Sequence, residues 1–406
     1  MALTFHHHQL KNGLDIIAEI NPDSHSFAAG FFVKTGSRDE SPQINGVSHF
    51  LEHMMFKGSS KYTWEDVNRI FDEIGARYNA FTTQEMTAYY ANVLPEFTER
   101  AIEHLSHLLR PAIRAEDFNT EKKVILEEIA MYLDDPGHRL WEKLMEIHFG
   151  NHPLSQSILG PSERIQALER DQMAEYFQRR YGPRNMVLAV TGKMDFDQVV
   201  KWTEKYCGAW APVDAPRTQP KPLYKPQKQT MTDAKLNRQY TMAMTPGPSA
   251  QDERRFGARV LSDVIGDSDG SRFYWALVDN AIAEDADFSF YPHDNCGSFF
   301  IALTTSPDRT QQALDIAIKE LERVKTDLTD DEVERAKNKI ASSIVLSGEV
   351  PAGRMRSIGG TWIYTNEYRS LEQDMDTLMS ITPDTLRQLM KDFPFHPMTI
   401  VTMGPK

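Results

Sequence analysis

The strongest constraint on this chain is the segment His49-Phe-Leu-Glu52-His53. In an α-helix, residues four positions apart lie on one face, about 6 Å apart along the axis. His49 and His53 can therefore present two imidazole nitrogens to one metal ion. Two histidines and one carboxylate suit zinc, and three protein ligands leave a fourth coordination position for water. The segment is predicted to be a helix that supplies two of three metal ligands.

Glu52 adds the chemistry that such a helix could perform. Zinc lowers the pKa of a bound water molecule to about 7, so hydroxide becomes available at neutral pH. A carboxylate beside that water can accept its proton and later pass it to a leaving amine. The order H-x-x-E-H is the motif of the inverzincin zinc peptidases. The alternative is a core helix whose histidines are satisfied by hydrogen bonds.

The third ligand is expected in the helical segment from Glu121 to Tyr132. Glu121 and Glu128 are seven positions apart, which is two helical turns, and they therefore share one face. Glu127 is rotated by about 100° from Glu128 and is expected to be a solvated charge. We predict that Glu128 is the metal ligand. We predict that Glu121 contacts one of the ligand residues without binding the metal itself, since such contacts orient ligands and tune metal sites.

These motifs resemble those of the pitrilysin/insulinase family of zinc peptidases, which includes the mitochondrial processing peptidase and bacterial members of similar length. The family pattern E-x-x-V-I-x-E-E is matched from Glu121 to Glu128, and 74 residues separate His53 from Glu128. The likeness also covers Asn79-Ala-Phe-Thr82 and His152-Pro-Leu, and so extends across the first half of the chain.

The resemblance implies one Zn²⁺ per chain on His49, His53 and Glu128, with Glu52 as the general base. It also implies that Asn79, Ala80 and Phe81 belong to an edge strand on which a peptide substrate lies. A peptide added there would gain main-chain hydrogen bonds whatever its sequence. The alternative is an interior strand with Phe81 in the core.

The second half departs from the family pattern. Relatives carry a run like S-R-L-F-x-x-L-R-E-x-x-G-L-A-Y, whose later Arg and Tyr hold the substrate and stabilise the developing oxyanion. This chain begins the run with Ser271-Arg272-Phe, but the later Arg and Tyr are replaced by Val278 and Asp285. We expect a homologous partner chain to supply the missing pair, which would make the enzyme a heterodimer. Other donors, such as Arg272, are the alternative.

The order of predicted elements indicates an α+β fold of two homologous halves. Each half is expected to have an antiparallel-rich sheet with helices packed on it, and the family resemblance implies that the halves form a clam-shell. Residues 1–210 form the zinc-bearing half, and residues 229–406 form the half without a metal site. Five prolines between Ala211 and Pro226 predict a semi-rigid linker over residues 211–228. The similar strands at 185–192 and 398–404 indicate a duplication of roughly 200 residues.

Composition narrows the function further. A net charge of −13 argues against nucleic-acid binding, and no apolar run is long enough to span a membrane. Cys207 and Cys296 are too few for a disulfide framework and are expected to be buried. The N-terminus has no apolar signal region, which favours a cytoplasmic protein, although a mature periplasmic form would look the same.

We therefore expect a zinc metalloendopeptidase subunit that hydrolyses peptides or unfolded segments. Two alternatives remain. One is a non-catalytic scaffold subunit that resembles the core proteins of the respiratory bc complex, and the other is a peptide-binding chaperone with a structural zinc ion.

Overall fold

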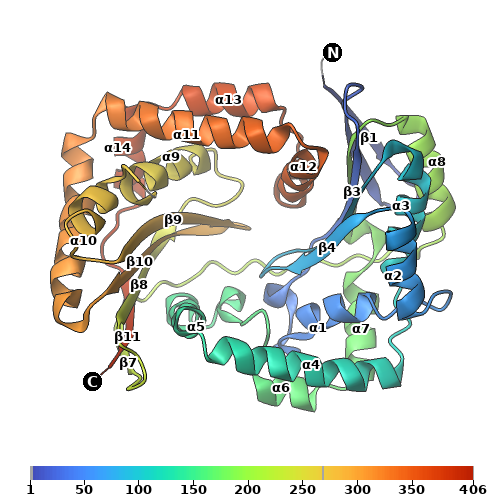
Figure 1. Ribbon diagram of the computed structural model, residues 1–406, viewed down its shortest axis with the longest axis horizontal. Helices are drawn as coiled ribbons and strands as arrows, with labels where there is room; N and C mark the ends of the chain where they lie inside the picture. The colour runs from blue at the N-terminus through green and yellow to red at the C-terminus, as the bar shows by residue number, and fades with distance from the viewer. Residues whose placement is uncertain (1–2, 268, 406) are drawn as a thin grey trace. The chain divides into compact units, whose positions relative to one another are not determined.

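The computed structural model describes residues 3–267 and 269–405, and their contacts divide the chain into two compact units (Figure 1). Each unit is assembled from segments that are distant in the sequence. The first unit comprises residues 1–130, 156–218 and 346–369, and the second comprises residues 131–155, 219–345 and 370–406.

The first unit contains a six-stranded sheet in the order β1-β2-β6-β3-β5-β4. Neighbouring strands are antiparallel except for the parallel pair β2 and β6. Strand β6 lies between β2 and β3, so the first three strands of the chain do not form a simple meander. The strands are β1 (Thr4–Gln9), β2 (Asp15–Ile20), β3 (Phe27–Val33), β4 (Arg77–Thr82), β5 (Thr87–Val93) and β6 (Met186–Gly192).

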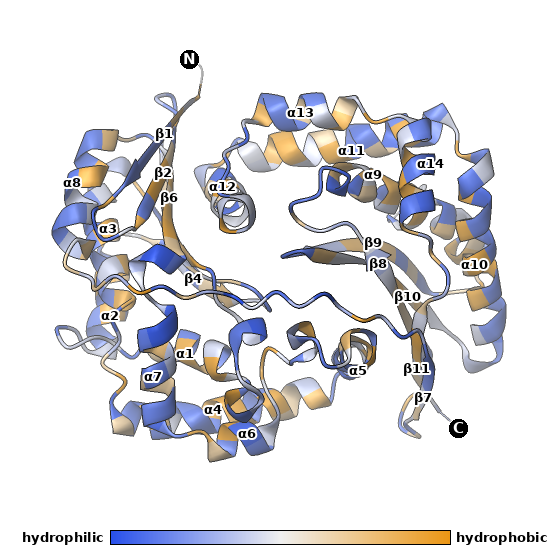
Figure 2. Ribbon diagram, turned by 180° about the vertical axis from the view of Figure 1, so that it is seen from behind, coloured by the Kyte–Doolittle hydropathy of each residue, from blue (hydrophilic) through white to orange (hydrophobic). Residues whose placement is uncertain are grey.

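Helices cover both faces of this sheet, and the alternation of strand side chains explains why. In β3, Phe31 contributes to the large core with most helices of the unit, whereas Phe32 packs with α12 on the opposite face. In Figure 2, β2 and β6 are largely orange and the outer helix α7 is largely blue. The helices are α1 (Val47–Met55), α2 (Trp64–Glu73), α3 (Thr98–Leu108), α4 (Ala115–Leu133), α6 (Ser162–Ala167), α7 (Arg170–Arg180), α8 (Phe196–Cys207) and α12 (Pro351–Thr365).

The second unit repeats the strand order of the first. Its five-stranded sheet has the order β7-β11-β8-β10-β9, which matches β2-β6-β3-β5-β4 strand by strand, including the parallel first pair. The α+β class and the two homologous halves are therefore confirmed. The strands are β7 (Lys228–Thr232), β8 (Gln239–Gly247), β9 (Asp285–His293), β10 (Cys296–Thr305) and β11 (Thr399–Gly404).

The helices of the second unit also cover both sheet faces. One face carries a large core, and the other packs against α5, whose Leu140 and Leu144 contact a cluster that includes Phe300 and Val401. The helices are α5 (Pro136–Phe149), α9 (Arg255–Gly266), a π-helix (Tyr274–Val278), α10 (Thr310–Asp327), α11 (Asp330–Gly348), α13 (Leu371–Met379) and α14 (Pro383–Asp392).

The two sequence halves thus exchange one helix each. Helix α5 comes from the first half of the sequence and packs in the second unit, whereas α12 comes from the second half and packs in the first. Helix α12 approaches β3 so closely that a Cβ on Gly359 would lie 2.3 Å from the ring of Phe32. Only glycine fits at this crossing.

The proline-rich segment has neither helix nor strand from residue 211 to residue 227. It is nevertheless anchored to the first unit by Arg217, whose buried guanidinium donates to both carboxylate oxygens of Asp39 at 2.9 and 2.7 Å. Among residues 3–267 and 269–405, no helix has the length and apolar character needed to cross a membrane.

Candidate metal centre

Helix α1 follows a glycine and is capped by a carboxylate from a preceding loop. Gly46 has a φ of 96°, a conformation that favours glycine, and the Glu40 side chain accepts hydrogen bonds from the amides of Gly46 and Ser48, each at 2.7 Å. Asn45 donates to the same carboxylate at 2.7 Å. Burial raises the pKa of Glu40 to about 7, although these donors lower it. Glu40 therefore fixes the start of the helix that carries both histidines.

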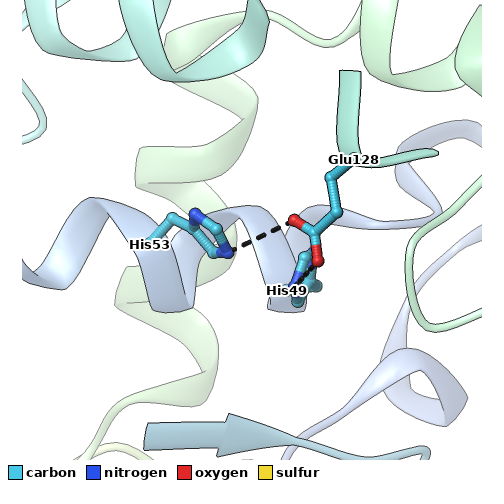
Figure 3. A group of neighbouring side chains, drawn as sticks. All are labelled: His49, His53 and Glu128. Carbon is cyan, nitrogen blue, oxygen red and sulfur yellow. Dashed lines mark ion pairs between the residues drawn. The ribbon is translucent and has the colours of Figure 1, made fainter. Parts of the chain in front are cut away.

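The structure brings His49, His53 and Glu128 together within the first unit. His49 and His53 lie on one face of α1, and Glu128 reaches toward both rings from α4 (Figure 3). Its Oε1 atom lies 3.8 Å from His49 Nε2, and its Oε2 atom lies 3.6 Å from His53 Nε2. One ligand atom of each residue lies within 4.8 Å of the others. This is the one such group of three or more metal-ligating side chains among the residues described.

The donor set fits a zinc ion. Bonds of about 2.0–2.1 Å in tetrahedral geometry separate neighbouring ligand atoms by roughly 3.4 Å. The distances from the Glu128 oxygens to His49 Nε2 and His53 Nε2 are close to this value, at 3.8 and 3.6 Å. Burial and the nearby charge of His53 lower the pKa of His49 to about 3. His49 is therefore neutral near pH 7, which is the form of imidazole that binds a metal.

Glu121 orients His53 from the side away from Glu128. Its Oε1 atom accepts a hydrogen bond from His53 Nδ1 at 2.9 Å, which leaves the Nε2 lone pair directed toward Glu128. The other oxygen of Glu121 lies 2.5 Å from Lys57 Nζ. Burial opposes charge on His53, but its hydrogen bond to Glu121 and the surrounding carboxylates raise its pKa overall. The hydrogen bonds from His53 and Lys57 likewise outweigh burial and lower the pKa of Glu121.

Glu52 lies one residue before His53 and is held by the edge strand of the sheet. Its Oε2 atom accepts a hydrogen bond from Thr82 Oγ1 at 2.5 Å. Burial raises the pKa of Glu52, while the bond from Thr82 and the charge of His53 lower it. A carboxylate with a raised pKa is suited to accept and release a proton near neutral pH. The contact between Thr82 and Glu52 was not predicted from the sequence.

The predicted substrate segment lies in β4, which is the last strand of its sheet among residues 3–267 and 269–405. Ala80 packs toward the core that contains α1. Its amide donates to Asn79 Oδ1 at 2.9 Å. Phe81 is half-buried and packs against the cluster that contains α12.

The remaining residues singled out in the sequence lie outside the group formed by His49, His53 and Glu128. Glu127 is exposed on α4, as expected for a solvated charge. Val278 ends the π-helix, and Asp285 begins β9. Arg272 is held within the second unit by Glu332 and Asp327, which lie 2.7 and 2.5 Å from its guanidinium nitrogens. Both cysteines are buried and free, as predicted.

Comparison with known proteins agrees with these motifs. The family model described as Insulinase (Peptidase family M16) matches residues 15–162, and the one described as Peptidase M16 inactive domain matches residues 167–340. A protein of Streptomyces coelicolor named as an uncharacterized zinc protease is 31% identical over 409 residues, covering 98% of this chain and 88% of that protein.

Two solved structures share the fold. A protease from Helicobacter pylori has a TM-score of 0.92 at 18% identity over 100% of both chains. A chain of Complex III2 from Candida albicans, solved with Inz-5 bound, has a TM-score of 0.86 at 17% identity over 98% of this chain and 95% of that chain. With both family models matched in order along its length, this chain belongs to the M16 family of peptidases.

Proposed function

We propose that this chain is the zinc-binding subunit of a metalloendopeptidase that hydrolyses peptides or unfolded segments. The observation that carries the proposal is the convergence of His49, His53 and Glu128 from two helices, with their ligand atoms within 4.8 Å of one another. The name of the Streptomyces relative supports zinc as the metal. When bound, zinc would act as a Lewis acid and make water more acidic.

Glu52 is the general base in this proposal. Its carboxylate accepts a proton from the attacking water and then donates that proton to the amine that leaves when the peptide bond breaks. Thr82 holds one oxygen of Glu52, so the other oxygen remains available for the proton. Glu121 keeps the proton of His53 on Nδ1 and thereby keeps Nε2 free for the metal.

Asn79, Ala80 and Phe81 hold the substrate as an added strand beside β4. The outer edge of β4 has no partner strand among the residues described. Main-chain pairing at an edge binds extended peptides with little regard for sequence. Because Thr82 of the same strand contacts Glu52, a peptide on this edge would lie next to the general base.

A homologous partner chain completes the site in this proposal. Positions 278 and 285 hold valine and aspartate, neither of which can donate the hydrogen bonds that a guanidinium and a phenol would provide. Arg272 is already engaged by two carboxylates. Full peptidase activity from the isolated chain would refute this requirement for a partner.

The test combines metal analysis with peptide cleavage, with and without the candidate partner. Glu52→Gln should retain one zinc ion per chain and lose turnover, whereas His53→Ala should lose both. Glu127→Gln removes an exposed charge from the same helix as Glu128 and should change neither measurement. Undiminished hydrolysis by zinc-loaded Glu52→Gln would refute the role of Glu52.

The second candidate is a non-catalytic scaffold subunit. The residues at 278 and 285 favour it, and the fold shared with the Complex III2 chain is compatible with it. A scaffold requires neither bound zinc nor peptide hydrolysis. Zinc-loaded protein that remains inactive with its partner present would favour this alternative.

A further inference from the structure

The two faces of β4 have different surroundings. Ala80 and Thr82 face the core and α1, where Thr82 bonds to Glu52. The side chains of Asn79 and Phe81 lie on the opposite face, because side chains alternate along a strand. A peptide added beside β4 alternates in the same way. Every second side chain of such a peptide would therefore point toward the side that carries α12.

Arg356 of α12 is an exposed cation on that side. Its guanidinium carbon lies 5.8 Å from the ring centroid of Tyr90, which is paired with Asn79 across the two strands. The ring of Tyr90 in turn lies 6.4 Å from that of Phe81, centroid to centroid. The cation thus adjoins Tyr90 of β5, whose ring neighbours Phe81 of β4, the edge strand beside the proposed peptide position.

The charge of Arg356 is not paired with a carboxylate within the parts of the chain that the structure describes. Arg354, two positions earlier, is buried and donates from Nε to Glu19 at 2.8 Å. No corresponding ion pair joins Arg356 to a carboxylate of residues 3–267 or 269–405. The two neighbouring arginines therefore differ in role, since only Arg354 holds α12 to the sheet.

The surroundings of Arg356 leave room for a ligand. Gly360 lies one helical turn further along α12, and a Cβ added there would meet no heavy atom within 4 Å. A guanidinium carries its donors in a fixed planar fork that matches a carboxylate, and it can rest on an aromatic ring while doing so.

We propose that Arg356 is a specificity-determining residue, which binds an aspartate or glutamate side chain of the peptide paired with β4. The preferred acidic residue occupies a position whose side chain points toward α12. This inference rests on the proposed function, because it requires a peptide on the β4 edge. The chain has a net charge of −13, so a local cation is needed to favour a carboxylate at one position.

The test measures binding in a Glu52→Gln background, in which bound peptides should stay intact. Fluorescent peptides that differ only by Glu, Gln or Lys at one position are titrated, and that position is scanned along the peptide. At one position the parent should bind the Glu peptide about fivefold more tightly than the Gln peptide, as expected for a partly exposed charged contact. Arg356→Gln should abolish this preference, and Arg356→Glu should make the Lys peptide the tighter ligand.

A matched control removes an equal charge elsewhere. Arg179 is an exposed arginine of α7, and Arg179→Gln should retain the preference. An unchanged Glu-to-Gln affinity ratio in Arg356→Gln, or no preference at any position in the parent, would overturn the inference. Preference that depends on Arg356, combined with no hydrolysis when Glu52 is intact, would contradict only the proposed function.

Discussion

Replacing Glu121 with glutamine tests how strongly the residue behind His53 supports the metal centre. Glutamine has nearly the same shape, and its oxygen can still accept from His53 Nδ1, so the substitution removes charge with little change in volume. The side chain of Glu121 is 6% exposed and lies 2.9 Å from Nδ1 and 2.5 Å from Lys57 Nζ. Solvent therefore screens little of the lost interaction.

The expected effect is a loss of zinc affinity of about 30-fold. Removing outer partners of metal-bound histidines typically reduces affinity 10–100-fold, and 30-fold corresponds to about 2 kcal/mol. That value agrees with the roughly 1.5–3 kcal/mol assigned to a hydrogen bond to a charged group. The protein should remain folded, because the hydrogen bond to His53 is replaced by a neutral one.

The assay is competition for Zn²⁺ between the protein and a fluorescent chelator at pH 7.5. Wild type, Glu121→Gln and Glu127→Gln are compared, and circular dichroism checks that each is folded. Glu127→Gln makes the same chemical change at an exposed site of the same helix and should bind zinc like wild type. Zinc affinity of folded Glu121→Gln within twofold of wild type would refute the reasoning.

Two further predictions concern the general base and acid stability. Thr82→Val removes the hydrogen bond to Glu52 and should lower kcat/KM about tenfold with zinc content unchanged, while Thr82→Ser should restore most of it. Since that bond lowers the pKa of Glu52, the acidic limb of the profile of kcat/KM against pH should move to higher pH in the valine variant. An acidic limb at the same pH, together with unchanged kcat/KM, would contradict the role of Thr82. Burial lowers the pKa of His104 to about 4. Between about pH 6.5 and pH 4 the unfolded chain therefore binds a proton at this histidine that the folded chain does not bind. The free energy of unfolding should consequently fall by up to about 3 kcal/mol on acidification. In urea unfolding from pH 7 to pH 4, His104→Gln should lose less stability than wild type, and parallel curves would show that His104 is not responsible.

Much of the candidate site could be predicted because its ligands follow helical periodicity. The four-residue spacing in α1 and the seven-residue spacing in α4 place His49, His53 and Glu128 on defined faces. That these faces meet required the family resemblance, since periodicity carries no information about which helices are neighbours. The same resemblance predicted the edge position of β4.

Other contacts depend on tertiary structure that no local pattern encodes. Glu40 caps α1 from a preceding loop, whereas sequence signals for caps usually involve the residue adjacent to the helix. Lys57 follows His53 by one turn, yet its partner Glu121 belongs to another helix. The contact of Thr82 with Glu52 depends on the register of β4 against β5 and on the packing of α1 beneath it.

The fold class was predictable from the mixture of strand and helix patterns, but part of the strand order was not. Strand β6 pairs with both β2 and β3 although it follows them by more than 150 residues. The exchange of α5 and α12 was also missed. Each helix has an ordinary apolar face, and nothing in its sequence tells which sheet that face will cover.

The exchange of α5 and α12 affects how the protein can be made. During synthesis the strands of the first sheet emerge long before α12, the helix that covers their second face, because α12 begins only at Pro351. Until then the face that includes Ile17, Phe32 and Val187 is bare, an apolar surface open to misassociation. We expect such a nascent chain to be prone to misassociation until α12 has been synthesised. Separately expressed pieces divided at the prolines would each lack a cover that the other contains, and should become stable only when mixed.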